Sequence, residues 1–322
     1  MSGTISVLEP GLFTTVQDLG RPGHARVGVS AAGAADAVAL RLANRLAGNP
    51  DGAPALEMTL VGGTFRFDAP GFVAIAGAEM QATIDGRPLP AWSAAPVPAG
   101  ATLACGAAAA GARAVLAVGG GLVVPPFLGS ASTHVPSRLG GLEGRALRPG
   151  DLLRVGASAC VPDPRPRHVR SDLLAALATT AATGAVLTLR VTPGPQADRF
   201  DEQARRLFAG SEYRVSGASD RMGLRLEGPP VAPPGGGAML TEGMPLGAIQ
   251  IPPAGRPVIL FVDHQTTGGY PVIASVASVD LPAVAQLRPG GRVRFATITL
   301  DEARGLLRER AAALEAASRF AA

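Results

Sequence analysis

Chemically reactive side chains are concentrated in three short segments, and the first of these follows a predicted strand. Residues 14–24 read Thr-Thr-Val-Gln-Asp-Leu-Gly-Arg-Pro-Gly-His. Because loops at strand ends often carry binding and catalytic residues, Thr15 and Gln17 are candidate substrate ligands. Arg21 can hold a carboxylate or a phosphate through paired hydrogen bonds, and Asp18 can act as a base or bind a metal. The alternative interpretation is an Asp–Arg pair that braces a Gly-Pro turn.

The second segment, residues 219–223, reads Ser-Asp-Arg-Met-Gly and precedes a predicted strand. An Asp-Arg pair beside glycine is most often a turn with a surface ion pair that contributes little to stability. Arg221 is also a candidate ligand for an anionic group, because guanidinium binds carboxylate and phosphate in a bidentate manner. Both interpretations stay open at this point.

The third segment, residues 263–271, follows a predicted strand and leads into a Gly-Gly pair that lets a ligand approach the backbone closely. His264 has the pKa range of a general base, but a single histidine between two polar residues is often only solvent-exposed. We therefore favour Asp263 as the catalytic candidate here. The candidates for binding are Gln265, Thr266, Gly268 and Tyr270, with Gln250 from an upstream strand.

The sequence contains no lysine, so all 29 basic residues are arginine. A phosphate-binding loop of the Walker type, a Schiff base and covalently attached biotin all require a lysine amine. Any nucleotide must therefore be held by arginine, by backbone amides or by another protein chain. No HExxH, GxSxG or clustered Cys/His pattern is present, so we expect neither a protein-held metal nor self-sufficient covalent hydrolysis.

The formal net charge of +4 does not indicate nucleic-acid binding, because the arginines are scattered and aromatic residues make up only 4% of the chain. The first residues lack the charged segment and the apolar run of a signal peptide. No apolar stretch reaches the length of a membrane span. We expect a cytoplasmic protein that contacts neither membrane nor nucleic acid.

Short apolar runs bounded by glycine or proline predict a mainly β protein in which strands position the three polar segments. The predicted strands are residues 5–8, 12–16, 64–67, 72–76, 114–118, 152–155, 186–191, 224–226, 238–240, 248–251, 258–262 and 293–296. Helical spacing of apolar residues predicts helices over residues 36–47, 171–182, 197–209 and 301–320. The predicted domains are residues 1–156 and 186–298, joined by a proline-rich linker over 157–185 and followed by a terminal helix over 299–322.

An internal similarity suggests that the two domains are related. Residues 147–155 read Leu-Arg-Pro-Gly-Asp-Leu-Leu-Arg-Val, and residues 287–295 read Leu-Arg-Pro-Gly-Gly-Arg-Val-Arg-Phe. Each segment places a Pro-Gly turn before a strand near the end of its domain. A repeated pattern of this kind predicts two β-barrel-like units.

The polar segments and their surroundings resemble one known family. The order TTVQDLGRPG, GAAD, LRLANRLAGNP, PALEMTL, SDRMGLRLEG, GAIQIPPAGRPVILFVDHQTTGGYP and DLPAVAQLRPG resembles the C subunit of 5-oxoprolinases, also called KipA or allophanate hydrolase subunit 2. The similarity extends from residue 5 to about residue 297. Ala32 stands where the family often has serine and His264 where arginine is frequent, which discourages a functional role for either residue.

The resemblance implies two cyclophilin-like β-barrel domains with a few short helices. It also implies a protein that acts with an A-subunit hydrolase and a KipI-like B subunit to open 5-oxo-L-proline to L-glutamate with ATP and Mg²⁺. The nucleotide would be bound by this chain or together with the partner subunit.

In the mechanism that the resemblance suggests, ATP phosphorylates the lactam oxygen, because amide resonance makes direct hydrolysis unfavourable. Arg21 and Arg221 would hold phosphate or the substrate carboxylate, while Asp18 or Asp263 would orient the lactam or bind Mg²⁺. Gln17, Gln265 and Thr266 would supply hydrogen bonds to the substrate.

Two alternatives follow from the same resemblance. The chain can be the carboxyltransferase component of a urea carboxylase or urea amidolyase system, in which another chain carries the biotin. It can also be a non-catalytic regulatory partner of a KipI-like kinase inhibitor. A requirement for bicarbonate and a biotinylated protein distinguishes the first alternative, and the absence of a polar pocket distinguishes the second.

Overall fold

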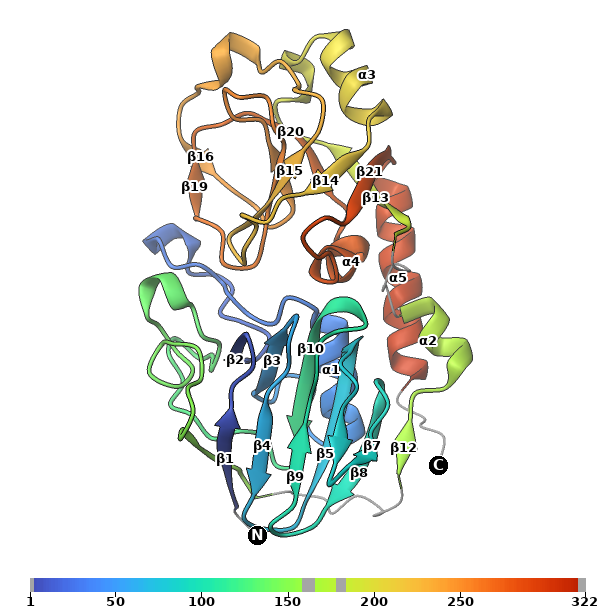
Figure 1. The fold of residues 1–322 in the computed structure, drawn as a ribbon. Coiled ribbons are helices and arrows are strands. Elements are labelled where there is room, and N and C mark those ends of the chain that lie inside the picture. The colour runs from blue at the N-terminus through green and yellow to red at the C-terminus, as the bar shows by residue number, and fades with distance from the viewer. Residues whose placement is uncertain (1–2, 158–165, 178–183, 318–322) are drawn as a thin grey trace. The chain divides into compact units, whose positions relative to one another are not determined.

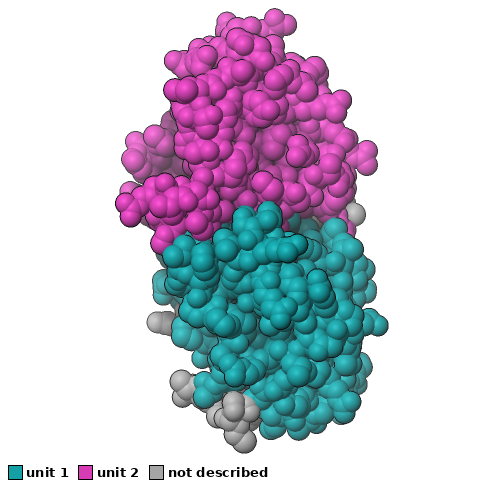
Figure 2. Space-filling view, turned by 90° about the vertical axis from the view of Figure 1, so that its left-hand side faces the viewer, with its two compact units in different colours: residues 1–21, 32–180, 310–322 teal, residues 22–31, 181–309 magenta. Residues whose placement is uncertain are grey.

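The computed structural model describes residues 3–157, 166–177 and 184–317, and these divide between two units (Figure 2). Within the described ranges, the N-terminal unit holds residues 3–21, 32–157, 166–177 and 310–317. The C-terminal unit holds residues 22–31 and 184–309. This division differs from the predicted linear one, because residues 22–31 join the C-terminal unit and residues 310–317 join the N-terminal unit.

Two six-stranded antiparallel sheets form the N-terminal unit (Figure 1). The first has the order β11-β1-β4-β9-β6-β7, with β1 at Thr4–Glu9, β4 at Thr64–Phe67, β6 at Thr83–Ile84, β7 at Arg87–Pro88, β9 at Thr102–Ala104 and β11 at Leu152–Arg154. The second has the order β12-β8-β5-β10-β3-β2, with β2 at Phe13–Gln17, β3 at Ala55–Thr59, β5 at Gly71–Glu79, β8 at Ser93–Val97, β10 at Ala110–Val118 and β12 at Arg167–His168.

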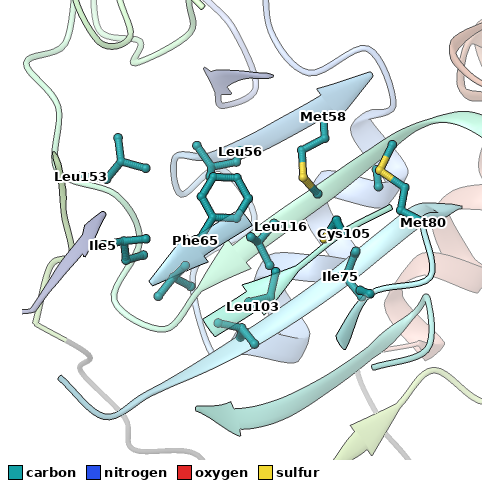
Figure 3. Packing of buried hydrophobic residues seen from close by; sticks show 14 of the residues in the cluster. Ile5, Leu56, Met58, Phe65, Ile75, Met80, Leu103, Cys105, Leu116 and Leu153 are labelled. Atoms are coloured by element: carbon teal, nitrogen blue, oxygen red, sulfur yellow. The ribbon is translucent and has the colours of Figure 1, made fainter. Parts of the chain in front are cut away.

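Alternate residues of both sheets point into one shared core, which Figure 3 shows in close-up. Ile5, Phe65 and Leu103 come from the first sheet, and Leu56 and Leu116 come from the second. All of these side chains are almost completely removed from water. Burial of each such side chain contributes about 1.5–3 kcal/mol relative to leaving it exposed.

The other face of the second sheet is covered by helix α1, Ala37–Ala47. Asp36 caps this helix, since its side chain accepts hydrogen bonds from the N–H groups of Val38 and Ala39. Gly48 ends the helix in the left-handed conformation. These bounds confirm the helix predicted over residues 36–47. The shorter helices of this unit are η2 at Val135–Ser137 and α2 at Ser171–Leu177.

The C-terminal unit contains a closed barrel with the order β13-β20-β17-β18-β15-β14-β21. Its strands are β13 at Val186–Pro193, β14 at Tyr213–Val215, β15 at Gly223–Glu227, β17 at Ala248–Gln250, β18 at Val258–Leu260, β20 at Val272–Val276 and β21 at Arg292–Thr297. A separate two-stranded ribbon pairs β16, Glu242–Gly243, with β19, Thr267–Gly268. The mainly β fold is therefore confirmed, with one closed barrel.

The helices of the C-terminal unit are short except for α3 and α5. They are η1 at Ala25–Val27, η3 at Ala197–Arg199, α3 at Glu202–Gly210, η4 at Pro234–Gly237, η5 at Ser278–Asp280, α4 at Leu281–Ala285 and α5 at Leu300–Ala316. The helix predicted over residues 197–209 is divided in two because the Asp201 side chain caps a new helix by accepting from Ala204 N–H. The last turn of α5 lies in the N-terminal unit, where the Arg45 side chain binds the carbonyl oxygen of Leu314.

Three expectations about elements need correction or completion. The strands of the N-terminal unit form two sheets with free edges rather than a closed barrel, so the prediction of two barrels holds only for the C-terminal unit. The strand predicted over residues 238–240 is wrong, because these residues follow the Pro-Gly-rich turn η4 and pair with no barrel strand. The ends of the helices predicted over residues 171–182 and 301–320 lie partly outside the described residues.

The internal similarity corresponds to one shared local structure. In both copies the residue after the Pro-Gly pair donates its N–H to the carbonyl oxygen of an arginine, Asp151 to Arg148 and Gly291 to Arg288. The glycines at the turn have positive φ angles, as a type II turn requires. The following strands pair differently, since β11 is antiparallel to β1 and β21 is parallel to β13. In the part of the chain that the structure describes, no helix is long and apolar enough to span a membrane.

Candidate functional site

Asp18 lies at the end of β2 and ties this strand to the loop that contains residues 130–132. Its Oδ1 accepts hydrogen bonds from the Ser130 hydroxyl at 2.6 Å, the Ser132 hydroxyl at 2.5 Å and the Gly20 N–H at 2.7 Å. Its Oδ2 accepts one from the Ala131 N–H at 2.6 Å. The carboxylate is buried. With four donors on its two oxygens, Asp18 holds two segments of the N-terminal unit together.

Arg21 performs a similar function three residues further on. Its side chain is 2% exposed, although the residue is one of the largest in the unit. The guanidinium donates to the carbonyl oxygens of Phe127 and Ser132 and lies 5.7 Å from the centre of the Phe127 ring. Gly140 has to be glycine, because a Cβ there would lie 2.1 Å from the Ser132 carbonyl oxygen. The Asp18–Arg21 turn therefore braces a second loop rather than forming an ion pair with itself.

Thr15 and Gln17 lie on the face of the second sheet that is turned away from the shared core. The Gln17 Nε2 donates to the Thr15 hydroxyl and to the Thr133 carbonyl oxygen, each at 3.0 Å. The cross-strand partner of Thr15 is Glu57, whose carboxylate accepts from the Ala35 N–H at 2.6 Å. Among the described residues nothing hydrogen-bonds to the Gln17 Oε1, so this buried oxygen is the one acceptor that the Gln17 side chain leaves open.

Arg221 and Asp263 form the main charged contact of the C-terminal unit. Arg221 Nε lies 2.8 Å from Asp263 Oδ2, and Arg221 Nη2 lies 3.1 Å from Asp263 Oδ1. The Asp263 N–H also donates to the Arg221 carbonyl oxygen at 2.9 Å. Both side chains are buried, at 7% and 2% exposure. The contact extends the pairing of β15 with β18 beyond the strands and fixes the start of the segment 263–271.

The polar residues after Asp263 continue as a chain of amides at the surface of the C-terminal unit. Exposed Gln265 donates from Nε2 to the Oε1 of buried Gln250 at 3.4 Å. Gln250 donates in turn to the Tyr270 carbonyl oxygen at 3.3 Å. A Cβ at Gly268 would lie 2.7 Å from the Gln250 Nε2, so glycine leaves room for the amide. The Thr266 carbonyl oxygen accepts from the Met244 N–H at 2.9 Å, which anchors the segment from the other side.

The structure adds Gln196 and Glu242 to this surface. The Gln196 Nε2 donates to a Glu242 carboxylate oxygen at 3.0 Å, and its Oε1 accepts from the Val272 N–H at 3.0 Å. Glu242 itself is exposed and belongs to β16, which pairs with β19 beside Gly268. Gln196 was not predicted, because it stands in a Pro-Gln-Ala turn far from the third segment in sequence. Only the register of β20 brings it there.

His264 has a pKa below its usual range. Burial disfavours the imidazolium form, while the hydrogen bond to the Gln265 carbonyl oxygen and the charge of Asp263 act in the opposite direction. Desolvation is the largest of these effects, so the ring is neutral near pH 7. The Nδ1 atom lies 2.6 Å from the Gln265 carbonyl oxygen. A donor is therefore required on Nδ1, which fixes the tautomer of the neutral ring.

The predicted site residues fall into two groups that belong to different units. Thr15, Gln17, Asp18 and Arg21 are in the N-terminal unit, and Arg221, Gln250, Asp263, Gln265, Thr266, Gly268 and Tyr270 are in the C-terminal unit. Each group is held together by the contacts given above. The catalytic roles of Asp18, Arg21 and Asp263, and one site shared by both groups, stay predictions.

A protein-family comparison identifies the chain over most of its length. The model of the carboxyltransferase domain, subdomain A and B, matches residues 27–297. This range contains the third polar segment, the Arg221–Asp263 pair and most strands of both units. The chain belongs to this carboxyltransferase-domain family.

Relatives of the chain in the carboxyltransferase-domain family carry two different names. The C subunit of the Escherichia coli 5-oxoprolinase is 38% identical over 93% of this chain and 93% of its own length. The urea amidolyase of Saccharomyces cerevisiae is 32% identical over 94% of this chain but only 17% of its own length.

Solved structures show the same division between the chain and longer proteins. The K. lactis urea amidolyase has a TM-score of 0.90 at 32% identity, covering 98% of this chain and 20% of that one. TTHA0988 has a TM-score of 0.81 at 36% identity, covering 91% of this chain and 55% of that one. The chain thus spans about half of TTHA0988 and a fifth of that urea amidolyase.

The donor groups within each unit do not fit direct binding of Mg²⁺ by the predicted carboxylates. Mg²⁺ sites usually use one or two carboxylates together with substrate phosphates. Asp18 already accepts four hydrogen bonds from the protein, and both oxygens of Asp263 face Arg221. In the described ranges no three His, Cys, Asp or Glu side chains group as a metal site. No step involving a nucleotide–metal complex is therefore assigned to these carboxylates.

Proposed function

We propose that this chain is the C subunit of an ATP-dependent 5-oxoprolinase and acts with an A-subunit hydrolase and a KipI-like B subunit. One observation carries the proposal. The chain and the C subunit of the E. coli 5-oxoprolinase match over 93% of both lengths, whereas the urea amidolyases match over only 17–18% of theirs. The C subunit of the Haemophilus influenzae 5-oxoprolinase supports the same proposal at 35% identity over 95% of this chain.

The substrate class suits the amide chain of the C-terminal unit. A lactam presents one N–H donor and one carbonyl acceptor side by side, and a glutamine side chain offers the complementary pair. In this proposal Gln265, Thr266 and Tyr270 contact the substrate, and Gln250 orients the Gln265 amide through their 3.4 Å hydrogen bond. Gly268 keeps the backbone close to the ligand.

The charged residues have a positioning role in this proposal. Arg21 and Arg221 would have to give up a protein acceptor to bind phosphate or the substrate carboxylate, and both are buried. Asp18 and Asp263 are engaged in the same way. We therefore place ATP and Mg²⁺ with the partner subunit.

A second candidate is a carboxyltransferase component acting on urea or a related amide. The family model and the TM-score of 0.90 with the urea amidolyase structure favour it. Because the chain contains no lysine, the biotin would be carried by another protein. Dependence of turnover on bicarbonate and on a biotinylated protein separates this function from the first.

ATP hydrolysis tests the proposal. The chain is co-purified with its KipI-like B subunit, and phosphate release is measured with and without 5-oxoproline. Stimulation by 5-oxoproline that disappears when either protein is omitted supports the oxoprolinase function. A stable complex with no stimulation contradicts it and favours the carboxyltransferase candidate.

A further inference from the structure

The N-terminal unit carries an apolar pocket at the outer edge of its first sheet, far in sequence from the polar segments. The pocket has a volume of about 440 Å³ and is lined by Leu122, Val123, Val124, Pro125, Leu152 and Arg154, among others. The Val123 N–H donates to the Arg154 carbonyl oxygen at 2.8 Å, so two backbone segments form its fixed wall. Its floor includes Leu153 and belongs to the shared core of the unit. The pocket is therefore part of the packed structure.

Exposed apolar side chains continue from the pocket along the same segment. Leu152 is 61% exposed, Val123 44%, Leu128 43% and Phe127 36%. Leu152 occupies the edge strand β11, whose side chain points away from the core while its neighbour Leu153 is buried. Contiguous exposed apolar area of this kind is typical of a surface that binds another molecule.

Two arginines on the outer face of the sheet give this surface its charge. Arg154 is the cross-strand partner of Thr4, and Arg66 is the partner of Ser6 on the neighbouring strand pair. Both arginines are exposed, and within the described ranges neither forms an ion pair or a side-chain hydrogen bond. The nearby acids Glu143 and Asp151 are both bound to Arg145. The rim of the pocket is therefore positive and uncompensated.

We propose that this surface, defined by the pocket, Leu152, Arg154 and Arg66, docks a partner protein. The partner would insert one apolar side chain into the pocket and place carboxylates against the two arginines. A small apolar carboxylate needs only the pocket and Arg154, but Arg66 lies outside the pocket lining, so the charged area is larger than such a ligand. Desolvated contacts between a central apolar anchor and a charged rim are typical of protein interfaces.

The partner that we assign is the KipI-like B subunit, so this inference rests on the proposed function. In TTHA0988 and in the K. lactis urea amidolyase the matching region is 55% and 20% of a longer chain. In those proteins the domain is covalently joined to further protein. A chain that lacks the additional part needs a non-covalent surface for it, and the docking surface supplies both apolar area and charge.

Binding to the KipI-like B subunit tests the docking surface. Calorimetry at low and moderate salt is carried out with the full chain and with the variants Leu152→Asp and Arg154→Glu. Both side chains are exposed, so neither variant disturbs the core, which circular dichroism checks. Arg87→Glu is the matched control, because Arg87 is an exposed arginine on β7 at the opposite edge of the same sheet.

We expect each surface variant to weaken binding at least tenfold, the control to change it less than twofold, and the effect of Arg154→Glu to shrink as salt rises. Equal affinity of all variants, or no binding by the wild type, overturns the docking surface. If the surface variants lose binding but the wild-type complex shows no hydrolysis stimulated by 5-oxoproline, the docking surface stands and the proposed function fails.

Discussion

Arg221 and Asp263 face each other through two hydrogen bonds, of 2.8 and 3.1 Å, in the interior of the C-terminal unit. A third bond joins their backbones, from the Asp263 N–H to the Arg221 carbonyl oxygen. The pair connects the end of β18 with the residue before β15. It therefore decides where the segment 263–271 begins, and with it the positions of Gln265 and Tyr270.

Removal of one member of this pair should destabilise the C-terminal unit. Asp263→Ala leaves the Arg221 guanidinium buried without its carboxylate, which costs roughly 3–5 kcal/mol of unfolding free energy. The double variant Arg221→Met, Asp263→Leu should recover most of this loss, because apolar residues of similar volume replace buried pairs well. Thermal unfolding followed by fluorescence gives the comparison. Single variants as stable as the wild type would show that the pair does not fix the segment.

The same variant separates a positioning role from a catalytic one. If Asp263 acts in the reaction, Asp263→Ala in the assembled complex lowers turnover much more than threefold, which corresponds to about 0.7 kcal/mol in the barrier. If it only positions the segment, the double variant restores turnover as well as stability. Turnover that stays low in a restabilised double variant would contradict the positioning role.

Asp18 should prove important for the N-terminal unit. In Asp18→Asn an NH₂ group replaces one acceptor oxygen, so at least one of the donors Ala131 N–H and Ser132 hydroxyl loses its partner. Hydrogen bonds to a charged group contribute about 1.5–3 kcal/mol each, and we expect a loss of roughly 3 kcal/mol. Glu9→Gln is the control, because Glu9 is an exposed acid of the same unit. Equal melting temperatures for both variants would disprove the bracing role of Asp18.

Gln265 should influence turnover without influencing stability. Its side chain is exposed and donates a single 3.4 Å hydrogen bond to Gln250, so Gln265→Ala should change the melting temperature very little. Loss of one hydrogen bond to the lactam should lower kcat/KM about tenfold, or about 1.4 kcal/mol. Gln203→Ala on the exposed face of α3 is the matched control. If the two variants have the same kcat/KM, Gln265 does not contact the substrate.

The stability of the C-terminal unit should depend on pH through His264. Burial lowers the pKa of His264 from 6.5, so near and below that pH the unfolded chain binds the proton more readily than the folded one. The resulting stability is present above pH 6.5 and is lost as pH falls toward the folded-state pKa. His264→Gln should reduce this pH dependence, with His168→Gln, at an exposed imidazole, as the control. An imidazole titration midpoint at or above 6.5, measured by NMR, would contradict the prediction.

The sequence was sufficient to predict the polar segments and many of the strands that carry them. The helix over residues 36–47 could be predicted because Asp36 and Gly48 supply both of its end signals. The Pro-Gly turns at Gly150 and Gly290 could be predicted for the same local reason. Such features depend on residues a few positions apart, so they need no knowledge of the rest of the fold.

Contacts between distant segments were not accessible in this way. The partners of Asp18 lie more than a hundred positions away in the chain, and nothing in the Ser-Ala-Ser sequence of residues 130–132 marks them as its ligands. Gln196 reaches Glu242 only because of the barrel register. The exchange of residues 22–31 and 310–317 between the units is likewise a result of tertiary packing, which local patterns do not encode.

Conversion of 5-oxoproline to glutamate by the reconstituted A, B and C subunits is the most direct test of the proposed function. Glutamate is quantified by chromatography with ATP present, and this chain is then omitted or replaced by Gln265→Ala. We predict ATP-dependent glutamate formation that requires this chain and falls about tenfold with the variant. Glutamate formation that does not depend on this chain, or turnover of urea that requires bicarbonate and a biotinylated protein, would contradict the oxoprolinase assignment.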